Sequence, residues 1–298
     1  MKVFLTGGSG FVGSHILTTL VQKGHSVKVL TRSESTRAGI HRRGGEVVIG
    51  NVNEPGPWED QLNDCETIIN LIGIIRETPT ATFEQSHYQA TIQLLSLAET
   101  KGIKRFLQMS ALGTREGAAS MYFQTKFRGE EAVRQSHLPY LIFRPSIIFG
   151  PGDGFVNMLA DLIRKAPLVP VVGSGEYKMQ PVSIHNVAKC FAIGLEKKEV
   201  LNQTFEIGGP SVLTYNTILD EIMDALGTHK GKIHLPVTLM KPVASLMELI
   251  LVNPLITTEQ MNMLLEDNVC DNGRVIEAFE LDLIPFSKGI REYLKTER

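Results

Sequence analysis

The segment Thr6-Gly-Gly-Ser-Gly-Phe-Val-Gly13 is the strongest indication of the fold in this sequence. It follows a short run of β-branched and aromatic residues at 2–6. It precedes apolar residues at helical spacing over residues 11–23. The stretch is therefore predicted to be the turn between a first strand and a first helix.

The glycines of this turn have the spacing Gly7-x-x-Gly10-x-x-Gly13. The first permits a tight turn, the second lets backbone approach a pyrophosphate, and the third lets the helix pack against the strand. The N–H groups at the helix start, those of Phe11 and Val12 among them, would hold phosphates with the positive end of the helix dipole. An ordinary glycine turn is the alternative, but the strand–turn–helix placement favours dinucleotide binding. A P-loop is excluded because no Gly-Lys-Ser/Thr follows.

Strand-like and helix-like segments alternate through the first half of the chain. Repeated units of this kind with short connections indicate a parallel sheet wrapped by helices on both faces, which is an α/β, doubly wound Rossmann fold. We predict the Rossmann domain at residues 1–149 and a smaller α+β substrate lobe at 150–298, parts of which return to the sheet. The predicted strands are 2–6, 25–30, 46–49, 67–72, 104–109, 140–143 and 205–208, and the predicted helices are 11–23, 83–100, 120–136, 155–165 and 214–226.

The composition is that of an ordinary globular enzyme. Of 298 residues, 43% are hydrophobic and 21% are charged, and the net charge of -2 argues against a nucleic-acid partner. The three cysteines are far apart and form neither a metal-binding spacing nor a disulfide framework. We therefore expect no metal site. The free cysteine pattern agrees with the cytoplasm or another reducing compartment. The chain starts directly with the first strand, which predicts no leader peptide.

One largely apolar stretch, residues 235–256, requires a test for a membrane span. Three prolines and two charged residues interrupt it, which argues against a transmembrane helix. We predict a buried or groove-lining helix at about 239–252. Association with a membrane surface or with a larger protein complex stays open.

The end of the second strand bears on the choice of cofactor. NAD-preferring sites carry an acidic residue there for the ribose hydroxyls. This chain has Val29-Leu-Thr-Arg-Ser33 instead, without a carboxylate. Arg32 can form a charge-assisted contact with a 2′-phosphate, so NADP(H) is expected over NAD(H).

Tyr122 and Lys126 form the motif Tyr-x-x-x-Lys on a predicted helix. Residues four apart share a helix face, so the phenol and the ammonium can meet at one ligand. A tyrosine with an ordinary pKa near 10 becomes a usable acid or base only if a nearby cation stabilises its phenolate. Lys126 can supply that charge, and Ser110 is a candidate hydroxyl after the fifth strand. The alternative is a half-buried tyrosine beside a solvated lysine.

Several motifs together resemble the short-chain dehydrogenase/reductase superfamily, in its extended and atypical branches. The closest likeness is to the group of the dehydrogenase-like accessory NAD(P)H-binding subunit of respiratory complex I. Besides the glycine turn and Tyr122-x-x-x-Lys126, the motifs are Leu71-Ile-Gly73, Met109-Ser-Ala111, Arg144-Pro-Ser-Ile-Ile-Phe-Gly-Pro151 and Pro181-Val-Ser-Ile-His-Asn-Val187.

The resemblance implies roles for individual residues. Gly7, Gly10 and Gly13 would hold the pyrophosphate and Arg32 the adenosine end. Tyr122 and Lys126 would face the nicotinamide ribose, and residues 150–157 and 179–182 the substrate. The remaining cofactor contacts implied are Asn51 and Val52 near the adenine, Leu71, Ile72 and Gly73 along the cleft, and Pro145 and Ser146 near the nicotinamide.

One departure from the superfamily pattern puts turnover in question. Ala111 stands where a catalytic hydroxyl is expected, with Ser110 one position early. Losing such a donor can cost a factor of about a hundred in rate.

The sequence leaves three hypotheses for the function: an NADP(H)-dependent oxidoreductase acting on a carbonyl/alcohol pair, an inactive nucleotide-binding subunit or assembly protein, and a nucleotide-sugar epimerase or dehydratase.

The C-terminal half bears on the substrate. An apolar, quinone-like or lipid-like molecule is expected there, and few polar groups are available for a sugar diphosphate. This hypothesis rests on Leu239, Val243, Leu246, Leu249 and Ile250.

Overall fold

The structure, a computed structural model, describes residues 1–240, 242 and 257–294 of the chain. It divides into two compact units, and each unit is assembled from three separate segments. Unit 1 consists of Met1–Pro145, Ile184–Ile207 and Gly273–Asp282, and unit 2 of Ser146–Ser183, Gly208–Asn272 and Leu283–Arg298.

Unit 1 is built on a seven-stranded sheet in the order β11-β6-β5-β4-β1-β2-β3, and every neighbouring pair is parallel. This confirms the predicted Rossmann-type α/β fold. The chain crosses from the β1–β2–β3 half to the β4–β5–β6 half, which brings the carboxyl ends of β1 and β4 side by side. The strands are β1 (Lys2–Thr6), β2 (Ser26–Thr31), β3 (Glu46–Ile49), β4 (Thr67–Asn70), β5 (Arg105–Met109), β6 (Tyr140–Pro145) and β11 (Gln203–Ile207).

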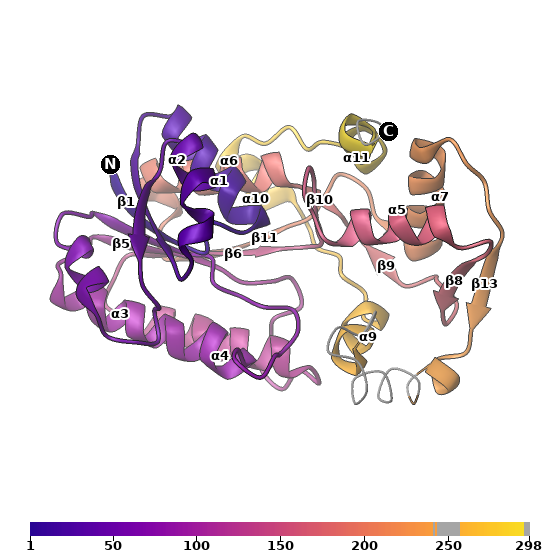
Figure 1. Cartoon of the computed structure of the whole chain (residues 1–298), viewed down its shortest axis with the longest axis horizontal. Coiled ribbons are helices and arrows are strands. Elements are labelled where there is room, and N and C mark those ends of the chain that lie inside the picture. The colour runs from indigo at the N-terminus through magenta and orange to yellow at the C-terminus, as the bar shows by residue number, and fades with distance from the viewer. Residues whose placement is uncertain (241, 243–256, 295–298) are drawn as a thin grey trace. The chain divides into compact units, whose positions relative to one another are not determined.

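Helices cover both faces of this sheet. Figure 1 shows α3 (Ala90–Thr100) and α4 (Met121–Gln135) along one face and α1 (Phe11–Gln22), α6 (Ile184–Glu196) and α10 (Gly273–Phe279) on the other. The predicted helix at 83–100 begins with a π turn at Glu84–Gln89 before it continues as α3. Shorter helical segments are η1 (Glu34–Thr36), α2 (Arg37–Arg42), η2 (Pro57–Leu62) and η4 (Lys198–Val200).

The core beneath α3 and α4 joins large side chains from several elements. Phe4 of β1 stacks on Trp58 with ring centroids 6.1 Å apart, and Ile68, Leu94 and Phe106 lie in the same buried cluster. Each fully buried side chain of this size contributes roughly 1.5–3 kcal/mol through the hydrophobic effect. This packing holds the strand ends in place.

Unit 2 has its own core, formed by side chains from helices and short strands. The described strands of this unit form three two-stranded sheets. Phe149 meets Phe286 edge to face in this core, at 5.1 Å between ring centroids. The helices are α5 (Phe155–Lys165), α7 (Tyr215–Leu226), α9 (Thr258–Leu265) and α11 (Phe286–Leu294), and the strands are β7 (Ile148–Phe149), β8 (Val169–Val172), β9 (Lys178–Met179), β10 (Val182–Ser183), β12 (Leu213–Thr214) and β13 (Lys232–Leu235).

The predicted helix at 239–252 lies almost entirely outside the described residues, as do Val243, Leu246, Leu249 and Ile250. Leu239 is described and is exposed. Among the helices of the described residues, none has the length and the apolar character needed to cross a membrane.

Candidate functional site

The glycine turn joins β1 to α1 and lies against the end of β4. Gly7 adopts a φ of +70°, a left-handed conformation that favours glycine. A Cβ atom added at Gly7 would lie 3.0 Å from the backbone carbonyl carbon of Leu71. The turn therefore approaches the backbone that follows β4 too closely for a larger residue.

The start of α1 packs directly on this turn. A Cβ atom at Gly13 would lie 2.1 Å from the carbonyl oxygen of Gly7, whereas one at Gly10 would have no neighbour closer than 3.4 Å. Gly8, which the spacing argument missed, is also required, because its Cβ would lie 2.6 Å from a methyl group of Val29. In the described chain, neither a side-chain cap nor an acidic residue occupies the first turn of α1. The helix start, which includes Phe11 and Val12, can therefore accept an anion.

Arg32 follows β2 at the same edge of the sheet. The pairing of Leu30 with Thr6 places the end of β2 beside the glycine turn, and Arg32 is exposed there. The nearby Arg37 is held by Glu34, with an Nε–Oε2 distance of 2.6 Å. Arg32 is therefore the better placed of the two arginines to meet a phosphate.

The other residues implied near the adenine have different environments. Asn51 is half-buried, and its side-chain amide donates to Glu54 at 2.7 Å. Val52 is buried in the core cluster beneath α3. Val52 can therefore contribute its backbone and its packing, but not an exposed side chain.

A buried hydrogen-bond network ties together the ends of the central strands. The Thr6 hydroxyl donates to the Asn70 Oδ1 at 2.7 Å, and the Asn70 amide donates to the Gln108 Oε1 at 2.9 Å. The same Asn70 Oδ1 accepts the backbone N–H of Ile72 at 3.2 Å. This network, which the sequence did not reveal, fixes the backbone from Leu71 to Gly73 relative to the glycine turn.

Tyr122 and Lys126 meet on the buried face of α4. The Lys126 Nζ lies 5.3 Å from the centroid of the Tyr122 ring, and 3.3 Å from where a Cβ of Gly73 would be. Burial raises the pKa of the Tyr122 phenol. Burial lowers the pKa of Lys126 to about 8, against the opposing negative charge of Glu130. Near pH 7, Lys126 is therefore mostly a charged ammonium, and the Tyr122 phenol keeps its proton.

The low pKa of Lys126 makes stability depend on pH. From about pH 8 to its ordinary pKa of 10.5, the folded chain binds fewer protons than the unfolded chain, so stability rises with pH. We expect a gain of about 1–2 kcal/mol between about pH 8 and pH 9.5. Urea denaturation at both values, for wild type and Lys126→Met, measures it. An equal pH dependence in the two proteins would contradict the assignment.

His87 is a member of this site that the sequence did not reveal. It lies in the π turn before α3, and its ring meets that of Tyr122 edge to face at 5.2 Å. Its Nδ1 lies 2.9 Å from the Thr125 hydroxyl, and its Nε2 accepts the backbone N–H of Ile74 at 3.2 Å. The sequence offered one signal for this residue, a histidine with Thr91 one helical turn later. This spacing does not distinguish a functional histidine without the tertiary contacts.

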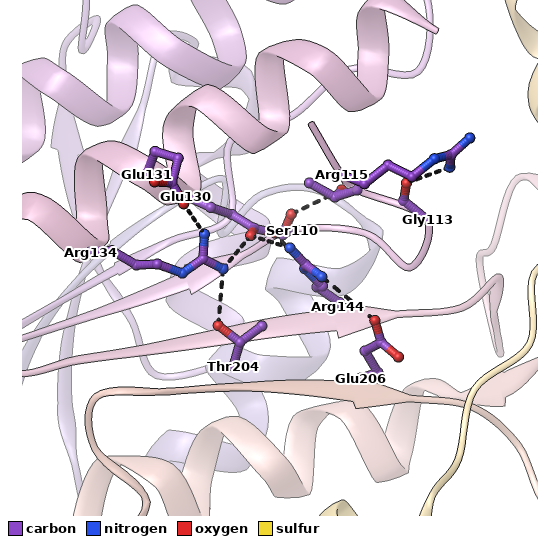
Figure 2. Close-up of polar contacts among 10 residues, drawn as sticks. Ser110, Gly113, Arg115, Glu130, Glu131, Arg134, Arg144, Thr204 and Glu206 are labelled. Atoms are coloured by element: carbon purple, nitrogen blue, oxygen red, sulfur yellow. Dashed lines mark hydrogen bonds and ion pairs between the residues drawn. The ribbon is translucent and has the colours of Figure 1, made fainter. Parts of the chain in front are cut away.

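One helical turn beyond Lys126, Glu130 is the centre of a buried ion-pair network (Figure 2). Its carboxylate has no exposed surface and accepts two hydrogen bonds from Arg144, at 2.8 and 2.6 Å, and one from Arg134 at 2.6 Å. Arg144 also pairs with Glu206 at 3.6 Å, and Arg134 donates to Thr204 at 3.1 Å. The network fastens α4 to β6 and β11.

Three further predicted site residues, Ser110, Pro145 and Ser146, have contacts of their own. Ser110 is buried at the end of β5, and its hydroxyl donates to Thr114 at 3.3 Å (Figure 2). The carbonyl of Pro145, the last residue of β6, accepts the N–H of Leu112 at 2.9 Å. In unit 2, Ser146 donates to the side chain of Asn268 at 2.5 Å.

A parallel sheet whose first strand enters a glycine turn and then a helix defines a Rossmann-type, nucleotide-binding class of protein. Within that class, residues 3–208 match the NAD dependent epimerase/dehydratase family, and the chain belongs to it. Membership confirms the resemblance to the extended short-chain dehydrogenase/reductases.

The chain is similar to two curated relatives in sequence and to one solved structure in fold. The mitochondrial NADH dehydrogenase (ubiquinone) 1 alpha subcomplex subunit 9 of Arabidopsis thaliana is 29% identical over 297 residues, covering 94% of this chain and 73% of that protein. A ceramide reductase of Caulobacter vibrioides is 31% identical over 170 residues, covering 57% of this chain and 53% of that protein. The UDP-glucuronic acid 4-epimerase of Bacillus cereus, solved with UDP-glucuronic acid and NAD, superposes with a TM-score of 0.78 at 17% identity, covering 100% of both chains.

Proposed function

We propose that this chain binds NADP(H) and is an oxidoreductase acting on the carbonyl or alcohol of a small, apolar substrate. The observation that carries the proposal is the continuity of the site. The glycine turn contacts the backbone of Leu71, and Lys126 lies against Gly73 two residues further on, with Tyr122 beside it. One dinucleotide with its pyrophosphate on the turn would therefore reach Tyr122 with its other end.

The side chains suit proton transfer to a carbonyl oxygen. The dinucleotide would supply the hydride. Tyr122 would donate its proton to the substrate oxygen, and the charge of Lys126 would stabilise the phenolate that is left. Since burial alone disfavours that phenolate, the ammonium 5.3 Å from the ring centre is necessary for the step.

A second candidate function is a structural subunit that holds the nucleotide without turnover. The Arabidopsis relative is named as a subunit of an NADH dehydrogenase. In this chain, Ala111 occupies the place of the expected hydroxyl, and the Ser110 hydroxyl is directed to Thr114. A nucleotide that binds only the folded state would then stabilise the protein by mass action.

The apolar substrate and the compartment are parts of the same proposal. The ceramide reductase acts, by its name, on a lipid, which agrees with the apolar composition of residues 235–256. Among the described residues, Cys65, Cys190 and Cys270 are not joined in disulfides, which fits a reducing compartment. Burial raises the pKa of Cys65 to about 11, so little reactive thiolate is present there.

Arg32→Ala tests the cofactor assignment. We expect calorimetry to show NADPH affinity reduced at least about tenfold and NADH affinity unchanged, because a charge-assisted hydrogen bond to the 2′-phosphate is lost. Arg42→Ala removes the same charge from an exposed position of α2 and is the matched control. Equal wild-type affinities for NADPH and NADH would overturn the NADP(H) assignment.

A Tyr122→Phe arm of the same experiment separates the two candidate functions. Binding should stay within about twofold, while consumption of NADPH with a panel of apolar ketones and quinones should fall about a hundredfold. Tight binding by the wild type without consumption of NADPH would favour the structural subunit.

A further inference from the structure

His87 is a buried titratable residue to which the proposed chemistry gives no role. Only 2% of its surface is exposed, and it lies in a π turn, a rare element that is frequent at functional sites. Its own carbonyl accepts the Thr91 hydroxyl at 2.8 Å. A Cβ at Gly129 of α4 would lie 2.6 Å from the same carbonyl. The π turn is therefore pressed against α4.

The imidazole of His87 connects two elements of the site. With the proton on Nδ1, the ring donates to the Thr125 hydroxyl at 2.9 Å, and Thr125 donates in turn to the Met121 carbonyl at 2.8 Å. The other nitrogen then accepts the Ile74 N–H at 3.2 Å. In the other tautomer, Nε2 donates to the Ile74 carbonyl oxygen at 3.1 Å and Nδ1 accepts the Thr125 hydroxyl, so the ring joins Ile74 to Thr125 in both. Ile74 follows the Leu71–Gly73 segment, and Thr125 lies between Tyr122 and Lys126, so one side chain links the two.

The ring of His87 also limits the freedom of its neighbours. It stacks on Phe83 at 5.4 Å and meets the Tyr122 ring at 5.2 Å. Its Nε2 lies 3.6 Å from the Cβ position of Gly73, next to the Lys126 Nζ at 3.3 Å. Burial and the charge of Lys126 lower the pKa of His87 to about 2. The ring is thus neutral at physiological pH.

We propose that His87 is a positioning residue for the nicotinamide end of the bound dinucleotide. By tying Ile74 to Thr125, it holds the Leu71–Gly73 backbone at a set distance from Tyr122 and Lys126. The adenosine end, at Arg32 on the other side of the glycine turn, does not depend on this link. The inference rests on the proposed dinucleotide binding and adds to it a residue that acts on only one half of the ligand.

The experiment compares a whole dinucleotide with its adenosine half. Calorimetry measures NADPH against adenosine 2′,5′-bisphosphate, and in parallel NADH against ADP, so the outcome does not depend on cofactor preference. His87→Phe keeps an aromatic ring and removes both hydrogen bonds. We expect it to weaken the preferred dinucleotide about tenfold and to leave the matching adenosine half within about twofold.

Two further variants keep the test decisive if His87→Phe does not fold. Thr125→Val removes the hydroxyl that pairs with Nδ1 and should reproduce the selective loss, whereas Thr125→Ser retains the hydroxyl and should restore binding. His25→Phe changes another buried histidine of unit 1, which contacts Met1 and Glu196, and should change neither affinity.

The outcomes separate this inference from the proposal on which it rests. Wild type that binds neither dinucleotide would defeat both. Wild type that binds tightly, with His87→Phe weakening both ligands equally or neither, would overturn only the positioning role. The positioning role is likewise overturned if Thr125→Ser behaves like Thr125→Val.

Discussion

Glu130→Ala is expected to lower the free energy of unfolding by about 3–5 kcal/mol, because it leaves the buried charges of Arg134 and Arg144 without their shared carboxylate. The carboxylate is fully buried and receives three charge-assisted hydrogen bonds from the two arginines. Urea denaturation followed by the fluorescence of Trp58, the single tryptophan, measures the change in unit 1, in whose core that side chain lies.

Glu131→Ala is the matched control for this prediction. Glu131 is the neighbouring residue of α4 and pairs with the same Arg134 at 2.6 Å, but its side chain is 39% exposed. An exposed ion pair contributes only about 0–1 kcal/mol, so this variant should be close to wild type. If both variants lose the same small amount, the network does not hold α4 against β6 and β11 as described.

Gly13→Ala is expected to abolish dinucleotide binding, with a loss of at least about a hundredfold, and to destabilise unit 1 by about 3 kcal/mol. The new Cβ would lie 2.1 Å from the Gly7 oxygen and 2.6 Å from the Cα of Gly8. Both neighbours are backbone atoms, which cannot rotate away, so α1 must move off the turn. Calorimetry with NADPH and urea denaturation measure the two effects.

Gly10→Ala separates binding from folding in the same turn. Its Cβ would meet nothing closer than 3.4 Å, so the variant should fold with nearly wild-type stability while the methyl group obstructs the approach of a pyrophosphate. Gly39→Ala, with 3.5 Å to the tip of a flexible arginine, should change neither property. Normal NADPH binding by Gly13→Ala would show that the turn does not hold the phosphates.

Local sequence patterns predicted most of the strands and several of the helices. The strands predicted at 2–6 and 46–49 and the helix at 155–165 of unit 2 have the predicted bounds, and the strand predicted at 25–30 is found at Ser26–Thr31. Such elements depend on hydrophobic periodicity and on glycines within a few residues, and both are visible in one dimension. The parallel sheet followed from their alternation.

The sequence did not predict α6 (Ile184–Glu196), and the reason is its position. Nine of its thirteen residues are buried, and its polar stripe is narrow, consisting of His185, Lys189 and Glu196, so the helical period is weakly marked. It packs on α1, and the strand that follows it, β11, pairs with β6. Tertiary packing of its broad apolar face stabilises this helix.

Only the tertiary structure brought the chemistry of the site together. Tyr122 and Lys126 were predictable because they lie four apart on one helix. By contrast, His87 pairs with Ile74, and Glu130 pairs with Arg144. The members of each pair come from different segments of the fold, and their spacing in the sequence does not indicate that they meet. The pKa of Lys126 likewise follows from burial and from the charge of Glu130. Residue types set which groups can ionise or donate, and the fold decides which of them lose water and acquire a partner.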